Sequence, residues 1–334
     1  MRIALVTDAW APQINGVVRT LQTVCGHVTA QGHTVLVVQP GLFPNLPCPT
    51  YPEIRLALTG PAQVAKLLND FQPDTIHIAT EGPLGWLARY WCLKHDFPFT
   101  TGYHTRFPEY LQARFGLPLG LGYAALRRFH APAAAVLVPT ASMAEALKTR
   151  GFHRVNVWGR GVDTELFQPR VSTAPAPWPR PILLNVGRVS VEKNLEAFIN
   201  LPVPGTKVVV GDGPQLASLQ ARYPKVVFTG AKQGAELTAL YNQADVFVFP
   251  SRTDTFGLVL LEALACGVPV AAYPVTGPLD VLTDPRVAAL DEDLGAAVTR
   301  ALTLSRQACR QFALKHSWAQ IAAHLLQQLV PLHR

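Results

Sequence analysis

Short apolar runs alternate with segments of helical pattern along the whole chain. Apolar runs of this length, bounded by Gly, Pro or polar residues, predict buried strands. The first spans residues 2–7 and is followed by a loop, by a predicted helix from Gly16 to about Gln31, and by a second strand within residues 32–40. Strand, loop, helix, strand is the repeating unit of a doubly wound α/β fold. Further along, we predict a helix over residues 61–70, strands within 73–85 and 97–101, and a strand followed by a helix within 133–151.

The same rhythm restarts after a proline-rich stretch, residues 171–181, in which regular structure is disfavoured. Beyond it, strand, loop and helix patterns follow one another over residues 181–200, 207–220 and 226–282. We therefore predict two domains joined near residue 170. The segment 312–329 has the alternation of an amphipathic helix.

Composition limits the class of protein. The chain has 334 residues, of which 49% are hydrophobic and 15% charged, so it can bury two cores and is not a disordered polyelectrolyte. Its net charge of +7 favours polyanionic partners: nucleic acid, acidic lipid headgroups or sugar nucleotides. Five scattered cysteines without a C-x-x-C pair argue against a disulfide framework or a zinc site and fit a reducing cytosol. We expect neither a signal peptide nor a membrane span.

Positive charge is concentrated between Arg106 and Arg160. Eight basic residues stand there against two acids, Glu109 and Glu145, and aromatic and leucine residues are interleaved with them. Such a segment suits an anionic membrane surface, and it equally suits a solvated helix over the core. Charge alone would allow a nucleic-acid partner, but no recognised binding motif supports one, and we expect none.

The stretch from residue 244 to 269 has the most distinctive chemistry. An apolar strand, a polar loop and the helical sequence LVLLEALA follow in that order, so the strand delivers Asp254, Thr255, Phe256 and Gly257 to the start of a helix. In an open parallel sheet this is where ligands bind, and the helix start favours an anion. Glu262 lies within the helix on an apolar face, where a carboxylate needs a partner.

Other candidate residues also follow predicted strands. Gly187 and Arg188 end one strand and Lys193 lies five residues beyond Arg188, so two cations there suit a diphosphate. Asn15 and Gly16 could bring backbone amides close to a phosphate, although the loop is not a dinucleotide-binding fingerprint. A further group follows strands of the first half: Glu81, Tyr103, His104 and Arg106.

These motifs together resemble retaining glycosyltransferases of family 4, which have the GT-B architecture. The resemblance covers nearly the whole chain and is carried by APQINGVVRT, HIATEGPLG, GYHTRFPEY, GRGVDTELF, GRVSVEKN and SRTDTFGLVLLEALACGVPV. Most members have Glu where this chain has Asp254, and a lipid-directed subset has the same Asp-Thr-Phe-Gly. The likeness is greatest to bacterial GDP-mannose-dependent α-mannosyltransferases and to sulfoquinovosyl- or glucosyl-diacylglycerol synthases.

The resemblance implies two Rossmann-like doubly wound parallel-sheet domains facing a cleft. Residues 1–170 would form the acceptor-side domain, 171–311 the nucleotide-sugar domain, and 312–334 a helix that crosses back to the first domain. It implies catalytic roles for His104, Asp254, Arg188 and Lys193. Donor-binding roles fall on Asn15, Gly16, Gly187, Gly211, Thr255, Phe256, Gly257 and Glu262, and acceptor-side roles on Glu81, Tyr103 and Arg106. Arg160 and Asp163 are secondary candidates or a structural ion pair.

The implied activity is transfer of a hexose, with mannose or glucose favoured, from GDP-mannose or a UDP-hexose to a lipid or glycolipid, with retention at the anomeric carbon. No metal or cofactor is expected, because Asp291 and Asp293 form the only Asp-x-Asp and flank a late helix. The alternatives are a soluble sugar or sugar-phosphate acceptor, and a nucleotide-sugar-binding protein without catalysis. We expect a cytoplasmic protein, or one peripheral to the inner face of the cytoplasmic membrane.

Overall fold

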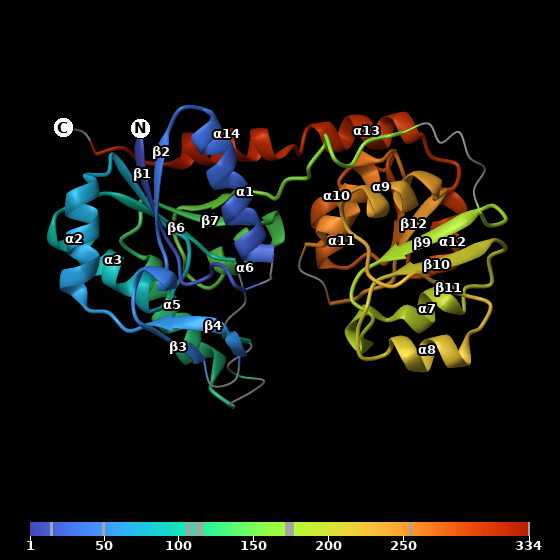
Figure 1. Cartoon of the computed structure of the whole chain (residues 1–334), viewed down its shortest axis with the longest axis horizontal. Coiled ribbons are helices and arrows are strands. Elements are labelled where there is room, and N and C mark those ends of the chain that lie inside the picture. The colour runs from blue at the N-terminus through green and yellow to red at the C-terminus, as the bar shows by residue number, and fades with distance from the viewer. Residues whose placement is uncertain are drawn as a thin grey trace. The chain divides into compact units, whose positions relative to one another are not determined.

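The computed structural model describes residues 1–13, 16–48, 51–104, 108–109, 112, 116–170, 177–253 and 256–332. The chain divides into two compact units, one made of Met1–Arg160 with Trp318–Arg334 and the other of Gly161–Ser317 (Figure 1). Each unit is built on a six-stranded sheet whose strand pairs are all parallel, which confirms the predicted pair of doubly wound α/β domains. Within the described ranges, no helix is long and apolar enough to cross a membrane.

The sheet of the first unit has the order β2-β1-β5-β6-β7-β8. Its strands are β1 (Arg2–Val6), β2 (Thr34–Val38), β5 (Thr75–Ile78), β6 (Phe99–Gly102), β7 (Ala135–Val138) and β8 (Val155–Val157). The helices are α1 (Gly16–Ala30), α2 (Pro61–Phe71), α3 (Pro83–Lys94), α5 (Leu119–His130), α6 (Ala141–Lys148) and α14 (Trp318–Gln328). An antiparallel hairpin of β3 (Asn45–Cys48) and β4 (Tyr51–Ala57) follows a short turn of 3₁₀ helix, η1 (Pro40–Leu42). Neither the hairpin nor α3 was predicted.

The alternation of side chains along β1 shows how the first sheet is covered. Ala4 and Val6 pack with α2 and α3 on one face, whereas Ile3 and Leu5 pack with α1 and α14 on the other. α1 and α14 lie side by side although they come from opposite ends of the chain (Figure 1). Strands buried on both faces explain the almost continuous apolar runs in the sequence.

The sheet of the second unit has the order β11-β10-β9-β12-β13-β14. Its strands are β9 (Ile182–Val186), β10 (Thr206–Val210), β11 (Val227–Phe228), β12 (Val246–Phe249), β13 (Val270–Ala272) and β14 (Ala288–Leu290). The helices are α7 (Leu195–Ile199), α8 (Leu216–Arg222), α9 (Gly234–Gln243), α10 (Leu258–Ala265), α11 (Thr276–Val281), α12 (Leu294–Ala301) and α13 (Arg306–Leu314), with a 3₁₀ turn η2 (Val191–Lys193). This is the strand order of a Rossmann fold.

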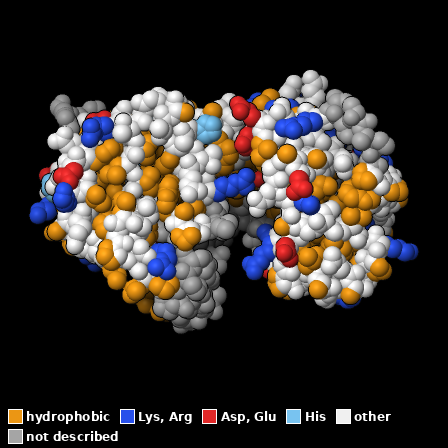
Figure 2. All heavy atoms as spheres, viewed as in Figure 1, with side chains coloured by type: hydrophobic (Ala, Val, Ile, Leu, Met, Phe, Trp, Pro, Cys, Tyr) orange, Lys and Arg blue, Asp and Glu red, His pale blue; other side chains and the backbone are white. Residues whose placement is uncertain are grey.

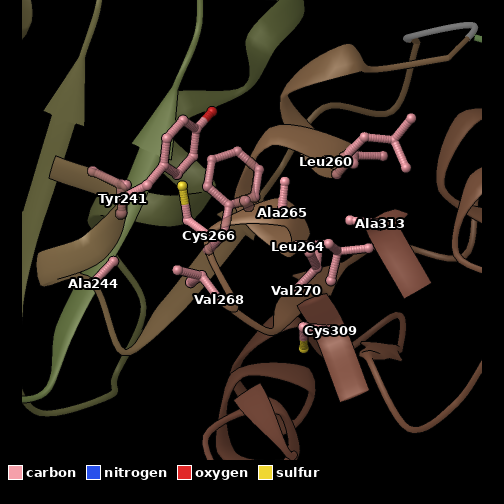
Figure 3. Close-up of a cluster of buried hydrophobic side chains, with 14 of the residues drawn as sticks. Tyr241, Ala244, Leu260, Leu264, Ala265, Cys266, Val268, Val270, Cys309 and Ala313 are labelled. Carbon is pink, nitrogen blue, oxygen red and sulfur yellow. The ribbon is translucent and has the colours of Figure 1, made fainter. Parts of the chain in front are cut away.

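The core of the second unit lies on both faces of its sheet. One cluster joins β9, β10 and β12 to α9, α10 and α13, and includes Tyr241, Leu260, Cys266 and Cys309 (Figure 3). The other face packs against α7, α8 and α12. The helix α10 is buried almost all round, as its composition of Leu, Val and Ala predicts, because it lies between the sheet and α13.

The structure divides the chain at other points than residues 170 and 312. Val162 and Phe167 are buried in the core of the second unit. The guanidinium of Arg310 fastens this segment, donating to the carbonyls of Thr164 and Phe167 at 2.9 and 2.8 Å. The proline-rich stretch therefore does not mark the boundary between the compact units.

The predicted helix over residues 312–329 is two helices. Phe312 belongs to α13 in the second unit, whereas α14 begins at Trp318 and packs in the first unit. A short break after Lys315 separates them. The amphipathic pattern continues across the break, so the sequence alone does not reveal it.

Candidate functional site

Each sheet has one place where neighbouring strands lead to connections on opposite faces. In the first unit this switch point lies between β1 and β5, and in the second between β9 and β12. Loops leaving such a pair of strands diverge and open a crevice at the carboxyl ends of the strands. Both switch points carry the polar residues described below.

A cavity of about 220 Å³ lies at the switch point of the second unit. It is lined from the end of β9, from η2, from the end of β12 and from the start of α10. The lining residues are Asn185, Val186, Gly187, Lys193, Phe249, Pro250, Ser251, Gly257, Leu258 and Val259. Gly187, Lys193 and Gly257 were predicted from the sequence, and the structure brings them together.

One side-chain hydrogen bond and one close backbone approach shape the surroundings of this cavity. The side-chain amide of buried Asn185 donates to the carbonyl of Val248 at 3.0 Å and joins the two strands at the switch point. Next to them, the loop after β10 approaches so closely that a Cβ on Gly211 would lie 1.8 Å from the carbonyl oxygen of Gly187. Gly211 therefore has a steric reason to be glycine, because only glycine permits that approach.

Two cations lie in the connection that follows β9. Lys193 lines the cavity itself, and Arg188 is exposed on the preceding loop. Between them, the hydroxyl of Ser190 donates to Glu192 at 2.6 Å and, with the charges of Arg188 and Lys193, holds the pKa of Glu192 below its usual value. Positive charge therefore accumulates at this strand end, as an anionic ligand requires.

Glu262 has the buried partner that its position in an apolar helix demands. Its carboxylate accepts a hydrogen bond from the hydroxyl of Tyr241 at 3.1 Å, and both residues are buried. The ring of Tyr241 packs between Phe167 and Phe247, with centroids 5.8 Å from each. This packing fixes where the hydroxyl, and with it the carboxylate, is held. The sequence did not indicate Tyr241.

The remaining predicted residues of this unit frame the start of α10. Gly257 caps the helix with a left-handed φ of 78°, a conformation that favours glycine. Phe256 is partly buried against the core. Asp254 and Thr255 lie outside the described residues.

In the first unit, Asp8 lies two residues beyond the end of β1 and connects the two sides of the switch point. Its carboxylate accepts from the backbone N–H of Leu84 at 3.0 Å and from the hydroxyl of Thr80 at 2.9 Å. It therefore neutralises the start of α3. Burial nevertheless raises the pKa of Asp8 above its ordinary value. A side chain on Gly82 would fall within 2.4 Å of this carboxylate, which explains the glycine.

His104 follows β6 and faces a buried arginine. A guanidinium nitrogen of Arg160 lies 3.5 Å from its Nδ1. Because guanidinium only donates, Nδ1 carries the lone pair and Nε2 the proton. Nε2 is buried with no partner within the described part of the chain. Burial, and then the charge of Arg160, hold the pKa of His104 well below its ordinary value. The imidazole is thus a neutral hydrogen-bond donor.

Two further histidines lie buried behind His104. His77 contacts the hydroxyl of Thr100 at 2.9 Å, and burial lowers its pKa to about 4. His130 contacts Thr101 at 2.8 Å and Glu81 at 3.3 Å. Glu81 therefore has a structural partner at the switch point, in addition to any role toward an acceptor.

The other predicted residues of the first unit are scattered. Tyr103 is buried in the core among residues of α5 and α6, so its side chain is not placed with His104. Gly16 begins α1 and is exposed. Arg160 turns to His104 rather than forming the ion pair, and Asp163 instead accepts from the N–H groups of residues 165 and 166. Asn15 and Arg106 lie outside the described residues.

Local partners occupy much of the basic segment 106–160. Four of its cations donate to neighbouring groups in the same unit: Arg127 to Arg150, Arg150 to Ala146, Arg154 to Ala131, and Lys148 to Glu145. Among the described residues no group of three His, Cys, Asp or Glu is arranged to hold a metal. Asp291 pairs with Arg300, and Asp293 caps α12.

Comparisons with known proteins agree with this arrangement. A model of Glycosyltransferase Family 4 matches residues 14–166, and a model of Glycosyl transferases group 1 matches residues 180–304. A GDP-mannose-dependent alpha-mannosyltransferase of Mycobacterium tuberculosis is 32% identical, with 98% of this chain and 95% of the relative covered. An alpha-monoglucosyldiacylglycerol synthase of Streptococcus pneumoniae is 27% identical, with 90% and 78% covered. The structure of sucrose-phosphate synthase from Thermosynechococcus elongatus superimposes with a TM-score of 0.71 at 21% identity, covering 98% of each chain.

The two Rossmann-like domains have the GT-B fold of the structural neighbours. The chain belongs to glycosyltransferase family 4, and it is a hexosyltransferase that uses a nucleotide-sugar donor. The resemblance identified from the sequence is confirmed.

Removing the Tyr241 hydroxyl tests how Glu262 is held. We predict that Tyr241→Phe leaves a buried carboxylate short of a donor and lowers the free energy of unfolding by about 1–3 kcal/mol. The Michaelis constant for the donor should rise more than kcat falls. Denaturant unfolding and steady-state kinetics measure the two effects. Tyr90→Phe, which removes an exposed hydroxyl, is the control, and equal behaviour of the two variants would contradict the assigned contact.

Titration of His77 should make stability depend on pH. Its folded pKa of about 4 lies below the ordinary value of 6.5, so the unfolded state binds the proton more readily between these values. Stability therefore rises with pH across this window and falls as pH drops, by roughly 3 kcal/mol in total.

Denaturant unfolding at a series of pH values measures this slope. His77→Gln should flatten it, and His153→Gln, which changes an exposed histidine, should leave it unchanged. His104 contributes a slope of the same sign, so some dependence on pH should remain. An unaltered slope in His77→Gln would show that His77 does not titrate as the burial requires.

Proposed function

We propose that the protein transfers a hexose from a nucleotide diphosphate sugar to a lipid or glycolipid acceptor, with retention at the anomeric carbon and without a metal ion. The cavity at the β9–β12 switch point carries this proposal, because it joins a cation, Lys193, to the start of the helix that contains Glu262. The donor is assigned to the second unit.

Lys193 and Arg188 neutralise the diphosphate in this proposal. A leaving nucleoside diphosphate gains negative charge as the glycosidic bond breaks, and fixed cations stabilise that charge more in the transition state than in the ground state. Arg188 suits bidentate contact with phosphate oxygens, and Lys193 acts as a point charge. Metal independence follows from assigning this work to the two side chains.

Glu262 accepts hydrogen bonds from the ribose hydroxyls, and Asp254 from hydroxyls of the transferred sugar, with the backbone of Phe256 and Gly257 beside it. An ionised carboxylate only accepts, which suits hydroxyl donors. Mannose and glucose are favoured because the two relatives compared above are named as a mannosyltransferase and a glucosyldiacylglycerol synthase. GDP-mannose and UDP-glucose are therefore the donors to test.

Retention is proposed with attack from the face that the leaving group vacates. The departing phosphate then takes the proton of the acceptor hydroxyl, and no enzymic nucleophile is required. His104, neutral and with a buried Nε2–H, donates to the sugar or the β-phosphate rather than acting as a base. The α-linkage in the names of both relatives is the product that retention of an α-configured donor gives.

A lipid or glycolipid acceptor is supported by the name of the streptococcal relative, a diacylglycerol glycoside synthase. The acceptor hydroxyl is assigned to the first unit, where His104 and Glu81 follow neighbouring strands.

The test is a transfer assay in EDTA. Radiolabelled GDP-mannose and UDP-glucose are offered with diacylglycerol in detergent, with a glycosyl-diacylglycerol, or with soluble sugars and sugar phosphates. We expect a lipid product whose anomeric carbon is α by NMR. Arg188→Ala and Lys193→Ala should each lower kcat/KM by about 10²–10³-fold. Lys225→Ala, which removes an exposed cation elsewhere in the second unit, should not.

Three results would contradict parts of the proposal. Transfer only to soluble acceptors would overturn the lipid assignment. Loss of turnover in EDTA that added Mg²⁺ or Mn²⁺ restores would overturn metal independence. Stabilisation of the fold by a donor without turnover on any acceptor would favour a binding protein.

A further inference from the structure

The helix α3 exposes a row of large apolar side chains. Trp86, Tyr90 and Leu93 are 37%, 54% and 44% exposed. Their spacing of four and then three residues places them on one face of the helix. The opposite face is buried against the sheet through residues such as Leu84 and Ala88. Isolated exposed apolar residues are ordinary, but three in a row on one helix face form a patch.

Trp86, at one end of this row, packs against α5. The ring of Trp86 meets the ring of Phe129 edge-on, with centroids 5.0 Å apart. Arg89 stacks on Trp86 at 5.3 Å and donates to the carbonyls of Phe129 and Arg128 at 2.9 and 2.8 Å. On α5, Leu121 is also highly exposed. We call the exposed row on α3, together with the end of α5 that Trp86 and Arg89 contact, the α3–α5 face.

The charged residues within α3 and α5 have one sign, and the exposed acid Asp96 lies two residues beyond α3. The two helices contain four Lys or Arg residues and no Asp or Glu. These cations are Arg89, Lys94, Arg127 and Arg128. Figure 2 shows hydrophobic side chains gathered over the unit that carries these helices, with Lys and Arg among them. A partner that matches this face would offer an apolar interior to the exposed rings and anionic groups at its surface to the cations.

We propose that the α3–α5 face docks the protein on an anionic phospholipid bilayer. Trp86, Tyr90 and Leu93 enter the boundary between headgroups and acyl chains, where Trp and Tyr rings are favoured, and Lys94 and Arg128 lie at the phosphates. This inference rests on the proposed lipid acceptor, because docking brings the first unit to the surface that holds it.

The charge pattern argues against a second copy of the chain as the occupant. A two-fold interface would place the same surface on both sides and bring like charges together, without an acid in either helix to compensate. An anionic lipid surface offers phosphates to the cations and acyl chains to the apolar row. The docking surface thus lies on α3 and the end of α5 rather than along the whole segment 106–160.

Vesicle flotation tests the proposal without requiring turnover. The full-length protein is mixed with phosphatidylcholine vesicles with or without phosphatidylglycerol. Binding is expected only when phosphatidylglycerol is present, and it should weaken with salt. Tyr90→Ser with Leu93→Ser avoids the Trp86–Phe129 contact and should reduce the bound fraction about tenfold. Lys94→Glu with Arg128→Glu should reduce it similarly.

Matched controls lie in the second unit. Leu279→Ser with Leu314→Ser removes two apolar residues that are 53% and 43% exposed, and Lys225→Glu reverses an exposed charge. These variants should bind vesicles as the wild type does. Thermal stabilisation by GDP-mannose or UDP-glucose confirms that each variant is folded.

Several outcomes would overturn the docking proposal. These are wild-type protein that does not float with either vesicle, equal loss in the control variants, or self-association in solution that the α3 variants abolish. The proposed function is tested separately, because transfer to diacylglycerol in detergent does not need docking. Transfer without flotation refutes docking alone, whereas flotation without transfer to any lipid refutes the lipid acceptor alone.

Discussion

The reversal of strand order between β9 and β12 is the constraint on which the proposed donor site depends. Connections from these two strands run to opposite faces of the sheet, so their loops separate and leave a cavity instead of covering it. Asn185 holds the strands together below the cavity, and Gly211 lets the next loop close its side without filling it. A ligand in this cavity can then contact the side chain of Lys193 and the backbone N–H groups at the start of α10.

Both units use a buried carboxylate beside the same kind of strand pair, for different purposes. Asp8 has a structural role, because its carboxylate accepts hydrogen bonds from the start of α3 and from the loop after β5. Glu262 lies inside α10, the helix whose first residues line the cavity, and accepts a hydrogen bond from Tyr241. A buried carboxylate needs hydrogen-bond donors in either case.

The order of strands and helices could be predicted from the sequence. Helices cover both faces of each sheet, so the strands are apolar throughout and stand out as short apolar runs. The helix α3 escaped prediction because its apolar residues lie on all sides, including the exposed face that carries Trp86 and Tyr90. Gly187, Lys193 and Gly257 could be predicted because they lie in the connections that leave β9 and β12 at the carboxyl ends of these strands. Tyr241 could not, since its contact with Glu262 joins separate helices and depends on how α9 and α10 pack. The partnership of Asp8 with α3 likewise depends on the β1–β5 pairing.

Hydrogen exchange with and without donor tests the central claim that the nucleotide sugar binds at the β9–β12 switch point. The account predicts that GDP-mannose or UDP-glucose slows exchange in the loops after β9, β10 and β12 and in the first turn of α10. Exchange of the hairpin β3–β4 should not change. Protection confined to the first unit, with the loops at 187–193 and 256–259 unaltered, would contradict the account.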